Sequence, residues 1–429
     1  MNNITYFSDR SFLKNIPEEI LSVMRSYGLV AIDDVKIHFC GLLSYGTKLA
    51  IFLPRNHSYH ESDLNMPGYY LLQALLKYFL NKESGIYSQE QGDTVIGGRT
   101  LLQITQLLDD YRINGLYVRR IKEKTINIGK VNWSRTIARS TAFPSNGSPV
   151  YLDLSTSRSR YMANCETAKI HAQVIRELLI NYGKLLFNTP NIIDERLLRL
   201  EAPTGDKRSQ IAYLERELCL SYYERDIFLI KGLIKYLRLE KGTEVSDVLI
   251  GVRKFHTLWE TMLDECLVGK YSVNKKLPIP VYRTIKDKFV TMAQKGQKTD
   301  TVLKHEKDKL FAVVDAKYYE ASSPQTAPGW PDLVKQFYYQ KAVSQLEGEG
   351  AVISNHFIFP GKEPFLKSAH VADREKKIQS EMDCLSEYSP IHCHYQDPIE
   401  LLKIYVEGRE LKTLTKKIFN VNKKRNFSD

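Results

Sequence analysis

Three carboxylates and one lysine in the last third of the chain have the residue types and spacing of a metal-assisted hydrolase. Asp315 and Lys317 lie two positions apart in the apolar segment Leu310–Tyr318, and side chains two apart on a β-strand point to the same face. Asp300 precedes them, and Glu260 lies further upstream in a predicted helix. Mg²⁺ prefers one or two carboxylates together with waters and phosphate oxygens. The group therefore predicts hydrolysis at a phosphate, in which the lysine orients or helps to deprotonate the attacking water.

An Asp-x-Lys pair by itself is commonly a surface ion pair, and that interpretation stays open for Asp315 and Lys317. Three features of the surrounding sequence favour the catalytic interpretation. The strand ahead of Asp315 is apolar enough to be central in a sheet. Asp300 falls at the expected end of a neighbouring strand, and a helix that carries Glu260 comes before both.

The segments around these residues predict alternating helices and strands. Apolar residues at helical spacing indicate a helix over about 252–267. A second helix is expected to begin at Pro331 and to reach about Leu346, because proline is favoured in the first helical turn. The remaining expected elements are strands at 310–318, 351–359 and 392–395 and a short helix at 399–406. This order predicts an α/β layer of ordinary domain size.

The whole chain is expected to be α/β, or α+β overall, because its regions differ in character. With 429 residues it is long enough for two or three domains. The predicted parts are an N-terminal mixed, β-rich domain with basic hairpins, a helical connecting layer, a C-terminal α/β domain and a basic tail. Their expected bounds are 1–160, 161–245, 246–410 and 411–429.

The positive charge is concentrated in three segments. The chain carries 61 Lys and Arg against 50 Asp and Glu, a net charge of +11. Residues 111–139 and 270–309 each carry an excess of seven positive charges, and residues 411–429 carry an excess of five. Concentrated positive potential attracts polyanions. Nucleic-acid binding and plain solvated faces remain equal alternatives on this observation alone.

Composition and motifs exclude several classes of protein. A hydrophobic content of 43% with 26% charged residues excludes wholesale disorder. Neither a secretory signal nor an apolar stretch of membrane-spanning length is found, and six scattered cysteines suit reduced thiols, so a cytoplasmic location without membrane partners is expected. The Gly-x-x-x-x-Gly-Lys-Ser/Thr phosphate loop has no match, so the chain is expected to bind no nucleotide itself.

The order of helix acid, Asp, Asp-x-Lys and helix is similar to the PD-(D/E)xK nuclease superfamily. More narrowly, the chain resembles the LlaJI and McrC families, the nuclease subunits of multi-subunit restriction systems. The matching stretches are Leu258–Glu260, Thr299–Asp300, Val313–Tyr319, Asp332–Tyr339, His38–Pro54 and Gly129–Ile137. Thr299 stands where the family frequently has proline. This departure weakens the alignment at Asp300, and Asp308 and Glu306 are fallback ligands.

The resemblance implies a restriction-endonuclease-like αβββαβ domain that hydrolyses DNA. Asp300 and Asp315 would bind Mg²⁺, for which Mn²⁺ can substitute, and Glu260 would complete the metal shell. Lys317 would assist the water. The resemblance also places a glutamine, Gln336, near the site, with a helix-surface amide as the equal alternative. The implied activity is that of a type II/IV-like restriction endodeoxyribonuclease in defence against phage.

The resemblance further implies partners. McrC-type subunits work beneath an AAA+ GTPase ring, so an McrB-like subunit, other restriction subunits and double-stranded DNA are expected. The basic hairpins at Gly115–Trp133 would contact the ring, and Arg135 would support that contact or the partner's nucleotide hydrolysis. For the individual residues, a core aromatic at Trp133 and a structural ion pair at Arg135 are favoured. Two other functions compete: a stand-alone DNA repair nuclease and a non-catalytic DNA-binding adaptor subunit.

Overall fold

The chain folds into two compact units. The computed structural model describes residues 4–45, 48–58, 66–86, 95–187, 194–239, 248–293, 296, 298–305 and 308–425. One unit comprises residues 99–246, and the other combines residues 2–98 with residues 247–429. Both contain helices and strands, so the fold is mixed α/β, as predicted. The division after residue 246 lies within one residue of the predicted bound at 245. The units do not divide at 160 or 410, and residues 2–98 group with the C-terminal segment because strands from both segments pair in one sheet.

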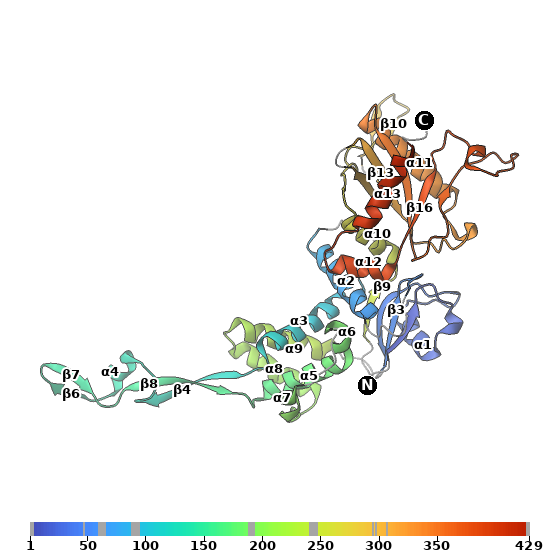
Figure 1. Cartoon of the computed structure of the whole chain (residues 1–429). Coiled ribbons are helices and arrows are strands. Elements are labelled where there is room, and N and C mark those ends of the chain that lie inside the picture. The colour runs from blue at the N-terminus through green and yellow to red at the C-terminus, as the bar shows by residue number, and fades with distance from the viewer. Residues whose placement is uncertain are drawn as a thin grey trace. The chain divides into compact units, whose positions relative to one another are not determined.

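A four-stranded sheet joins the two sequence segments of the discontinuous unit (Figure 1). Its order is β1-β3-β2-β9, in which β1 and β3 are parallel and the other neighbours antiparallel. Gly41 and Gly251 pair where β2 meets β9, and a Cβ atom at either position would collide with Phe39 and with the opposite backbone. The strands are β1 (Ile4–Ser8), β2 (Cys40–Tyr45), β3 (Lys48–Leu53) and β9 (Leu249–Val252).

A five-stranded sheet forms the centre of the C-terminal segment. Its order is β12-β13-β14-β16-β15, and the three inner strands β13, β14 and β16 are parallel. All seven residues of β13 are buried, because parallel sheets are covered on both faces. The strands are β12 (Thr301–Lys304), β13 (Leu310–Ala316), β14 (Val352–Pro360), β15 (Ser368–Ala369) and β16 (Ile391–Gln396). These bounds confirm the predicted strands.

Helices cover both faces of this sheet. Helix α11 packs Tyr339 and Val343 against Phe311 and Val313 of β13. Side chains alternate along a strand, so the residues between these belong to the opposite face, where α13 packs against β13 and β14. The helices of this unit are α1 (Glu18–Ser26), α2 (Met66–Glu83), α10 (Phe255–Cys266), α11 (Trp330–Glu347), α12 (Pro398–Val406) and α13 (Lys412–Arg425), with short 3₁₀ turns at Leu13–Asn15, Pro324–Thr326 and Glu381–Asp383.

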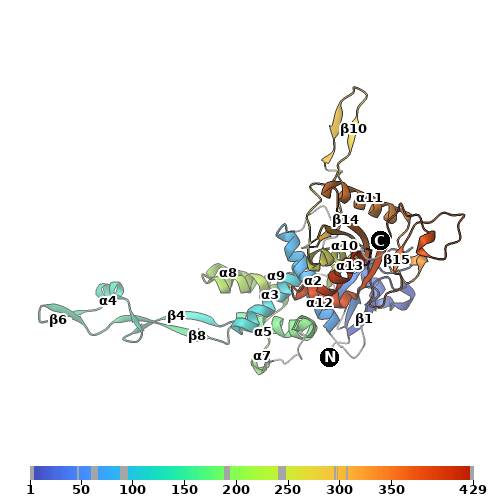
Figure 2. The ribbon, with the colours of Figure 1, turned by 45° about the horizontal axis from the view of Figure 1, so that its top comes forward.

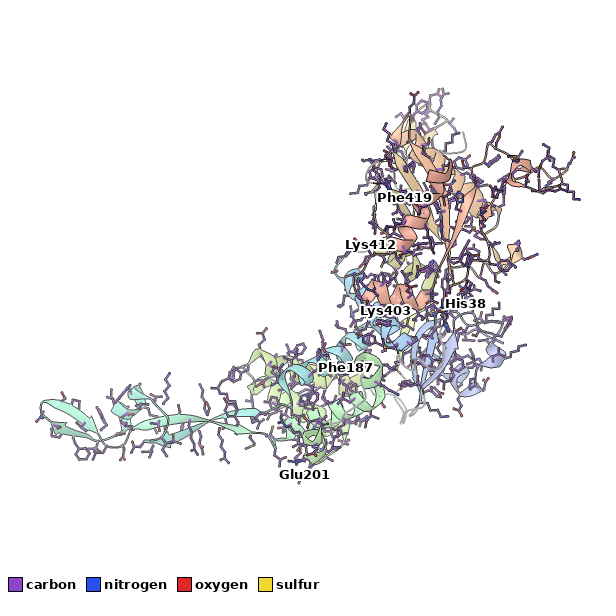
Figure 3. All side chains as sticks on the ribbon, viewed as in Figure 1. His38, Phe187, Glu201, Lys403, Lys412 and Phe419 are labelled. Atoms are coloured by element: carbon purple, nitrogen blue, oxygen red, sulfur yellow. The ribbon has the colours of Figure 1, made fainter. Side chains whose placement is uncertain are left out.

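The predicted tail at 411–429 is wrong for most of its length. Residues 412–425 form α13, whose apolar positions Leu414 and Ile418 are buried. Phe419, labelled in Figure 3, packs edge-on against His305 next to β12. The helix therefore belongs to the folded unit, because its apolar stripe completes the cover of the sheet. Among the described helices, none has the length and apolarity needed to cross a membrane.

The unit of residues 99–246 is a helical body with a long β-ribbon (Figure 1). The structure differs from the predicted hairpins at Gly115–Trp133 in how the strands pair. Residues 119–126 form one strand, β4, which pairs along its whole length with the distant strand β8. The helices are α3 (Gly98–Asn114), α4 (Trp133–Arg139), α5 (Glu166–Leu178), a π-helical turn (Leu179–Gly183), α6 (Lys184–Phe187), α7 (Glu195–Arg199), α8 (Lys207–Leu220) and α9 (Glu224–Leu239), and the strands are β4 (Arg119–Ile126), β5 (Lys130–Val131), β6 (Ala142–Ser145), β7 (Ser148–Tyr151) and β8 (Ser155–Met162).

Candidate active site

The C-terminal end of β13 positions the Asp-x-Lys pair. Asp315 is the last but one residue of this buried strand and is only 2% exposed. Lys317 is the first residue after the strand, and its backbone N–H donates a hydrogen bond to the carbonyl of Ile358 on β14, at 3.0 Å. The two side chains meet as the two-residue spacing predicts, with Lys317 Nζ 3.0 Å from Asp315 Oδ2. Asp315 is buried and the side chain of Lys317 is only 12% exposed, so the interpretation as a surface ion pair is wrong.

Lys317 is held between two carboxylates. Its Nζ lies 2.7 Å from Asp332 Oδ1 in the first turn of α11, in addition to the contact with Asp315. Burial lowers the pKa of Lys317, but the negative charges and hydrogen bonds of Asp315 and Asp332 outweigh it and raise the pKa above its ordinary value. The side chain is therefore an ammonium at neutral pH. It can stabilise negative charge and orient a water molecule, but it does not accept a proton.

Asp300 approaches the pair from the start of β12. Its Oδ2 accepts a hydrogen bond from the backbone N–H of Ala316, at 3.1 Å. Burial raises the pKa of Asp300 well above its ordinary value, and the charge of Asp315, a hydrogen bond to that carboxyl and the charge of Glu260 raise it further. Two carboxyl groups that lie this close share a proton unless a cation separates them.

Glu260 contributes a third acid from α10. Its helix is fixed by fully buried side chains, among them Trp259 and Met262, at the predicted apolar positions. Burial and the charge of Asp315 raise the pKa of Glu260 to about 7, although Lys317 and Lys335 lower it. Glu260 therefore faces the same charged centre as the two aspartates.

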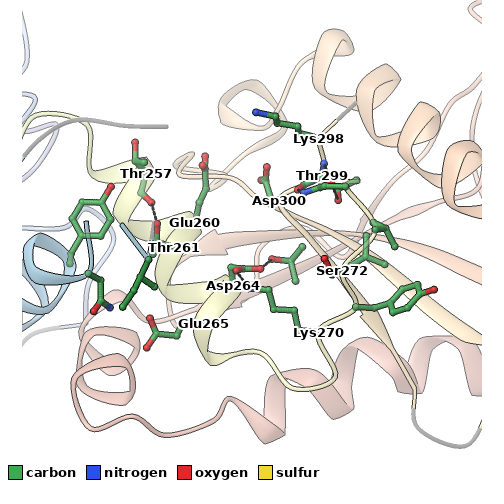
Figure 4. A pocket seen from close by; sticks show the side chains of 18 residues that line it. Thr257, Glu260, Thr261, Asp264, Glu265, Lys270, Ser272, Lys298, Thr299 and Asp300 are labelled. Carbon is green, nitrogen blue, oxygen red and sulfur yellow. Dashed lines mark hydrogen bonds and ion pairs between the residues drawn. The ribbon is translucent and has the colours of Figure 1, made fainter. Parts of the chain in front are cut away.

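Glu260 and Asp300 line a cavity of about 680 Å³ (Figure 4). Asp264, Lys270 and Lys298 lie in its wall. A second cavity of about 390 Å³ also reaches Glu260, and Lys317 forms part of its lining. The charged centre is thus open to solvent and to a ligand on two sides, while Asp315 itself stays buried.

The donor set fits a magnesium ion with two protein carboxylates. Oxygen ligands are what Mg²⁺ prefers, and it usually keeps several waters. A divalent cation between Asp300 and Asp315 would remove the repulsion that raises the pKa of Asp300. No group of three or more His, Cys, Asp or Glu side chains in the described part of the chain is arranged to hold a metal ion. Direct ligation by Glu260 therefore stays a prediction.

Gln336 lies close to the site but points into the sheet. It is fully buried, so the alternative of a helix-surface amide is wrong. Its Nε2 donates to the carbonyl of Val313 at 2.8 Å, two residues before Asp315. This bond fixes α11 against β13. Within the structure Gln336 is a positioning residue, and a direct catalytic role stays a prediction.

The fallback ligands are less suitable than Asp300. Asp308 pairs with His305 at 3.2 Å and precedes β13, whereas Asp315 lies near the other end of that strand. Seven strand residues correspond to about 23 Å, which no single metal ion spans. Glu306 lies outside the described residues.

Two residues of α11 were not assigned a role by the sequence pattern. Asp332 pairs with Lys317 and also accepts a hydrogen bond from Tyr319 Oη, at 3.1 Å. Lys335 lies one turn further along the helix. Burial lowers the pKa of Lys335, but the charges of Asp315 and Asp300 raise it above its ordinary value. Asp332 and Lys335 are three residues apart and so lie on one face of the helix, and this spacing was the sequence signal that could have identified them.

Curated proteins give no significant sequence match. One similar structure is a complex of Thermococcus gammatolerans McrB AAA+ hexamers with bound McrC, at 14% identity and a TM-score of 0.41, covering 96% of this chain and 100% of that one. Another is the McrBC complex of the same organism, at 12% identity and a TM-score of 0.27, covering 61% and 88%.

The model of the LlaJI restriction endonuclease family matches residues 39–371. The match includes the four residues Glu260, Asp300, Asp315 and Lys317 and the three elements α10, β12 and β13 that position them. Because it covers more than half of the sequence and confirms the resemblance seen in the motifs, the chain belongs to the LlaJI restriction endonuclease family.

Proposed function

We propose that this chain is the DNA-cleaving subunit of a restriction system, with a PD-(D/E)xK site that hydrolyses phosphodiester bonds in the presence of Mg²⁺. The observation that carries the proposal is the meeting of Asp300, Asp315 and Lys317 at the end of one buried strand, beside an open cavity. Family membership supports a nuclease. The type II/IV-like class is part of the proposal.

The residues would divide the work by charge. Asp300 and Asp315 would hold Mg²⁺, or Mn²⁺ in its place, and Glu260 would bind it directly or through water. When bound, the metal ion supplies positive charge for the phosphate and lowers the pKa of the attacking water. Lys317, an ammonium held by Asp315 and Asp332, would orient that water and stabilise the negative charge that develops on the phosphate.

An McrB-like AAA+ GTPase is the proposed partner. The ribbon of the helical unit, whose side chains are drawn in Figure 3, supports a protein contact because large apolar side chains along it are exposed. Trp133 is 57% exposed and Ile137 is 61% exposed, so the interpretation of Trp133 as a core aromatic is wrong. Arg135 makes no ion pair with any residue that the structure describes, which contradicts the structural ion pair. Contact of this ribbon with the ring remains a prediction. So do the cytoplasmic location and the expectation that the partner, and not this chain, binds the nucleotide.

The test is DNA cleavage by the reconstituted system. Wild type and Lys317→Ala are each combined with the proteins encoded beside the gene, Mg²⁺, GTP and ATP. We expect the variant to lose cleavage by about 10²- to 10³-fold, because it lacks the charge that stabilises the transition state, while DNA binding is retained. Equal cleavage by both would assign the nuclease to a partner and leave this chain as a basic adaptor.

Copurification distinguishes the restriction subunit from a stand-alone repair nuclease. A ring-forming GTPase that copurifies with the full chain supports the restriction system. Robust, nucleotide-independent cleavage by the chain alone would favour the stand-alone enzyme. Trp133→Ala, which removes an exposed aromatic far from Lys317 in sequence, should weaken the association without changing the active site.

A further inference from the structure

A second hairpin projects from the unit that holds the active site. Strands β10 (Val281–Arg283) and β11 (Phe289–Thr291) pair in antiparallel fashion, and Figure 2 shows the hairpin extending away from the sheet. We propose that this hairpin binds duplex DNA by entering the major groove next to the phosphate that is cleaved. The inference rests on the proposed function, because it names how that site would hold its substrate.

The base of the hairpin is a wall of the candidate active site. Asn274 Oδ1 accepts hydrogen bonds from the backbone N–H and the hydroxyl of Thr299, both at 2.9 Å, and Asn274 Nδ2 donates to the carbonyl of Thr299 at 3.0 Å. Asp300 is the next residue. Asn274, Lys298, Thr299 and Asp300 all line the 680 Å³ cavity, and the last three are labelled in Figure 4. A ligand held by the hairpin would therefore lie at the mouth of this cavity.

The hairpin has no core of its own. Every residue from Val281 to Thr291 is exposed, and neither face of the two strands is covered. Tyr282 and Val290 pair on one face, while Ile285 at the tip is fully bare. A two-stranded ribbon is marginally stable alone, and clustered bare apolar side chains mark an interaction site. These observations predict that a partner covers the hairpin.

Its charge identifies the partner as a polyanion. Six exposed cations lie between positions 275 and 298, and the single acid in the described part of that segment, Asp287, pairs with Arg283 at 2.8 Å. The six are Lys275, Lys276, Arg283, Lys286, Lys288 and Lys298. Lysine is depleted from the cores of protein–protein interfaces, whereas phosphate backbones are bound mainly by Lys and Arg. Nucleic acid therefore fits this surface better than a protein does.

The shape of the hairpin fits the major groove of a duplex. That groove is about 12 Å wide and admits a two-stranded β-ribbon. From Pro280 to the tip at Ile285 the ribbon can extend about 17 Å at the usual rise per strand residue, which exceeds the groove depth of about 8.5 Å. The tip can thus reach base edges while Lys286 and Lys288 contact phosphates on the groove walls. Tyr282 and Phe289 supply apolar contacts of the kind made with thymine methyl groups.

The test measures binding by the full chain to a labelled duplex of about 20 base pairs, two helical turns. Chelator is added so that no cleavage occurs, and salt is varied. The hairpin variant is Lys286→Ala with Lys288→Ala. The matched control is Lys376→Ala with Lys377→Ala, two lysines that are also exposed and lie on another loop of the same unit. Loss of two phosphate contacts should reduce the slope of log K against log salt by about 1.8. The control should match wild type.

A second variant tests the apolar contacts. Ile285→Ala with Phe289→Ala should weaken binding several-fold while the salt slope stays at the wild-type value, because no charge is removed. All four hairpin positions are exposed, so thermal unfolding should be unchanged in both variants.

The outcomes separate this inference from the proposed function. Binding and salt slope equal to the control in both hairpin variants would overturn the inference, even if the reconstituted system cleaves DNA. Normal DNA binding with lost association to a neighbouring protein or to a second copy of the chain would also overturn it, and would make the hairpin a protein interface. Weaker binding with no cleavage by any preparation would retain the hairpin as a DNA contact and refute the nuclease.

Discussion

The two faces of the sheet formed by β13, β14 and β16 bury ionisable side chains in opposite ways. The face under α11 holds Asp315 next to Asp300 and Lys317, with charges that repel and attract one another beside two cavities. The face under α13 holds His356, whose Nδ1 lies 2.9 Å from His394 Nε2 and whose Nε2 lies 2.7 Å from Ser354 Oγ. Burial lowers the pKa of His356 well below its ordinary value, so these rings are neutral.

The two faces differ in that the first buries charged groups that repel one another, whereas the second buries neutral groups that hydrogen-bond to one another. Neutral histidines that hydrogen-bond to each other cost little free energy to bury, so a structural role is enough to explain this face. Clustered carboxylates cost stability unless a cation joins them. Perturbed groups beside a cavity are the pattern of a functional site. We therefore expect changes on the face with Asp300, Asp315 and Lys317 (the carboxylate face) to alter metal binding and activity. Changes on the face with His356 and His394 (the histidine face) should alter the stability of the fold.

The largest expected effect is on the carboxylate face. Asp315→Asn should reduce Mg²⁺-dependent DNA cleavage at least about 10³-fold, because metal-assisted charge stabilisation is worth several kcal/mol. Cleavage assays on the reconstituted system measure this. In parallel, Mg²⁺ should raise the melting temperature of wild type by mass action and leave that of the variant unchanged. An equal rise in both proteins would show that the metal binds elsewhere.

The matched change on the other face should affect stability instead. His356→Ala removes a fully buried ring and leaves Ser354 and His394 without one partner each, so we expect a loss of about 2–4 kcal/mol in the free energy of unfolding. Urea unfolding measures it. Cleavage per folded molecule should stay at the wild-type level. Reduced cleavage by His356→Ala under conditions where the variant is fully folded would contradict the proposed difference between the two faces.

A smaller effect is expected from the residue that holds Lys317. Asp332→Asn keeps the shape of the side chain but removes one of the two charges on the ammonium. We expect cleavage to fall about 10- to 100-fold, as for residues that orient catalytic ligands. Because Asp332 acts through Lys317, Asp332→Glu should recover part of the activity, and the Lys317→Ala Asp332→Asn double variant should be no worse than Lys317→Ala. Additive losses would give Asp332 an independent role.

The smallest effect concerns pH and the histidine face. Burial, His392 and Lys417 lower the pKa of His394 to about 4, whereas the unfolded ring titrates near its ordinary 6.5. Protons therefore bind the unfolded chain more readily between these values, and stability should decrease as the pH falls from 6.5 towards 4. Melting temperatures across this range, compared between wild type and His394→Gln, measure the contribution. An identical pH profile in the two proteins would remove His394 as its source.

The sequence predicted much of the candidate site because the relevant signals are local. Apolar spacing located α10 and α11 within one to three residues at each end, and the buried run at 310–318 located β13. The two-residue spacing of Asp315 and Lys317 predicted their contact. The grouping of Asp300 with this pair also holds, since its carboxylate bonds the backbone of Ala316.

Long-range pairing accounts for what the sequence did not predict. Strand β4 pairs with β8, more than thirty residues away at its far end, and no local turn signal reports that register. The terminal basic segment folds because a sheet face lacks cover, and its charge pattern alone resembles a solvated end. Gln336 was expected near the reacting groups, but its amide bonds the strand backbone instead.

By itself, the sequence determined which residues can do chemistry and which strand carries them, because alternation along a strand and periodicity along a helix are set by backbone geometry. Only the tertiary structure brought Asp332 and Lys335 of α11 to that strand, opened a cavity beside Glu260, and left the β10–β11 hairpin bare at its edge. Such contacts join segments that are distant in the sequence, and no local sequence pattern predicts them. They are decided by which faces the whole chain can bury at once.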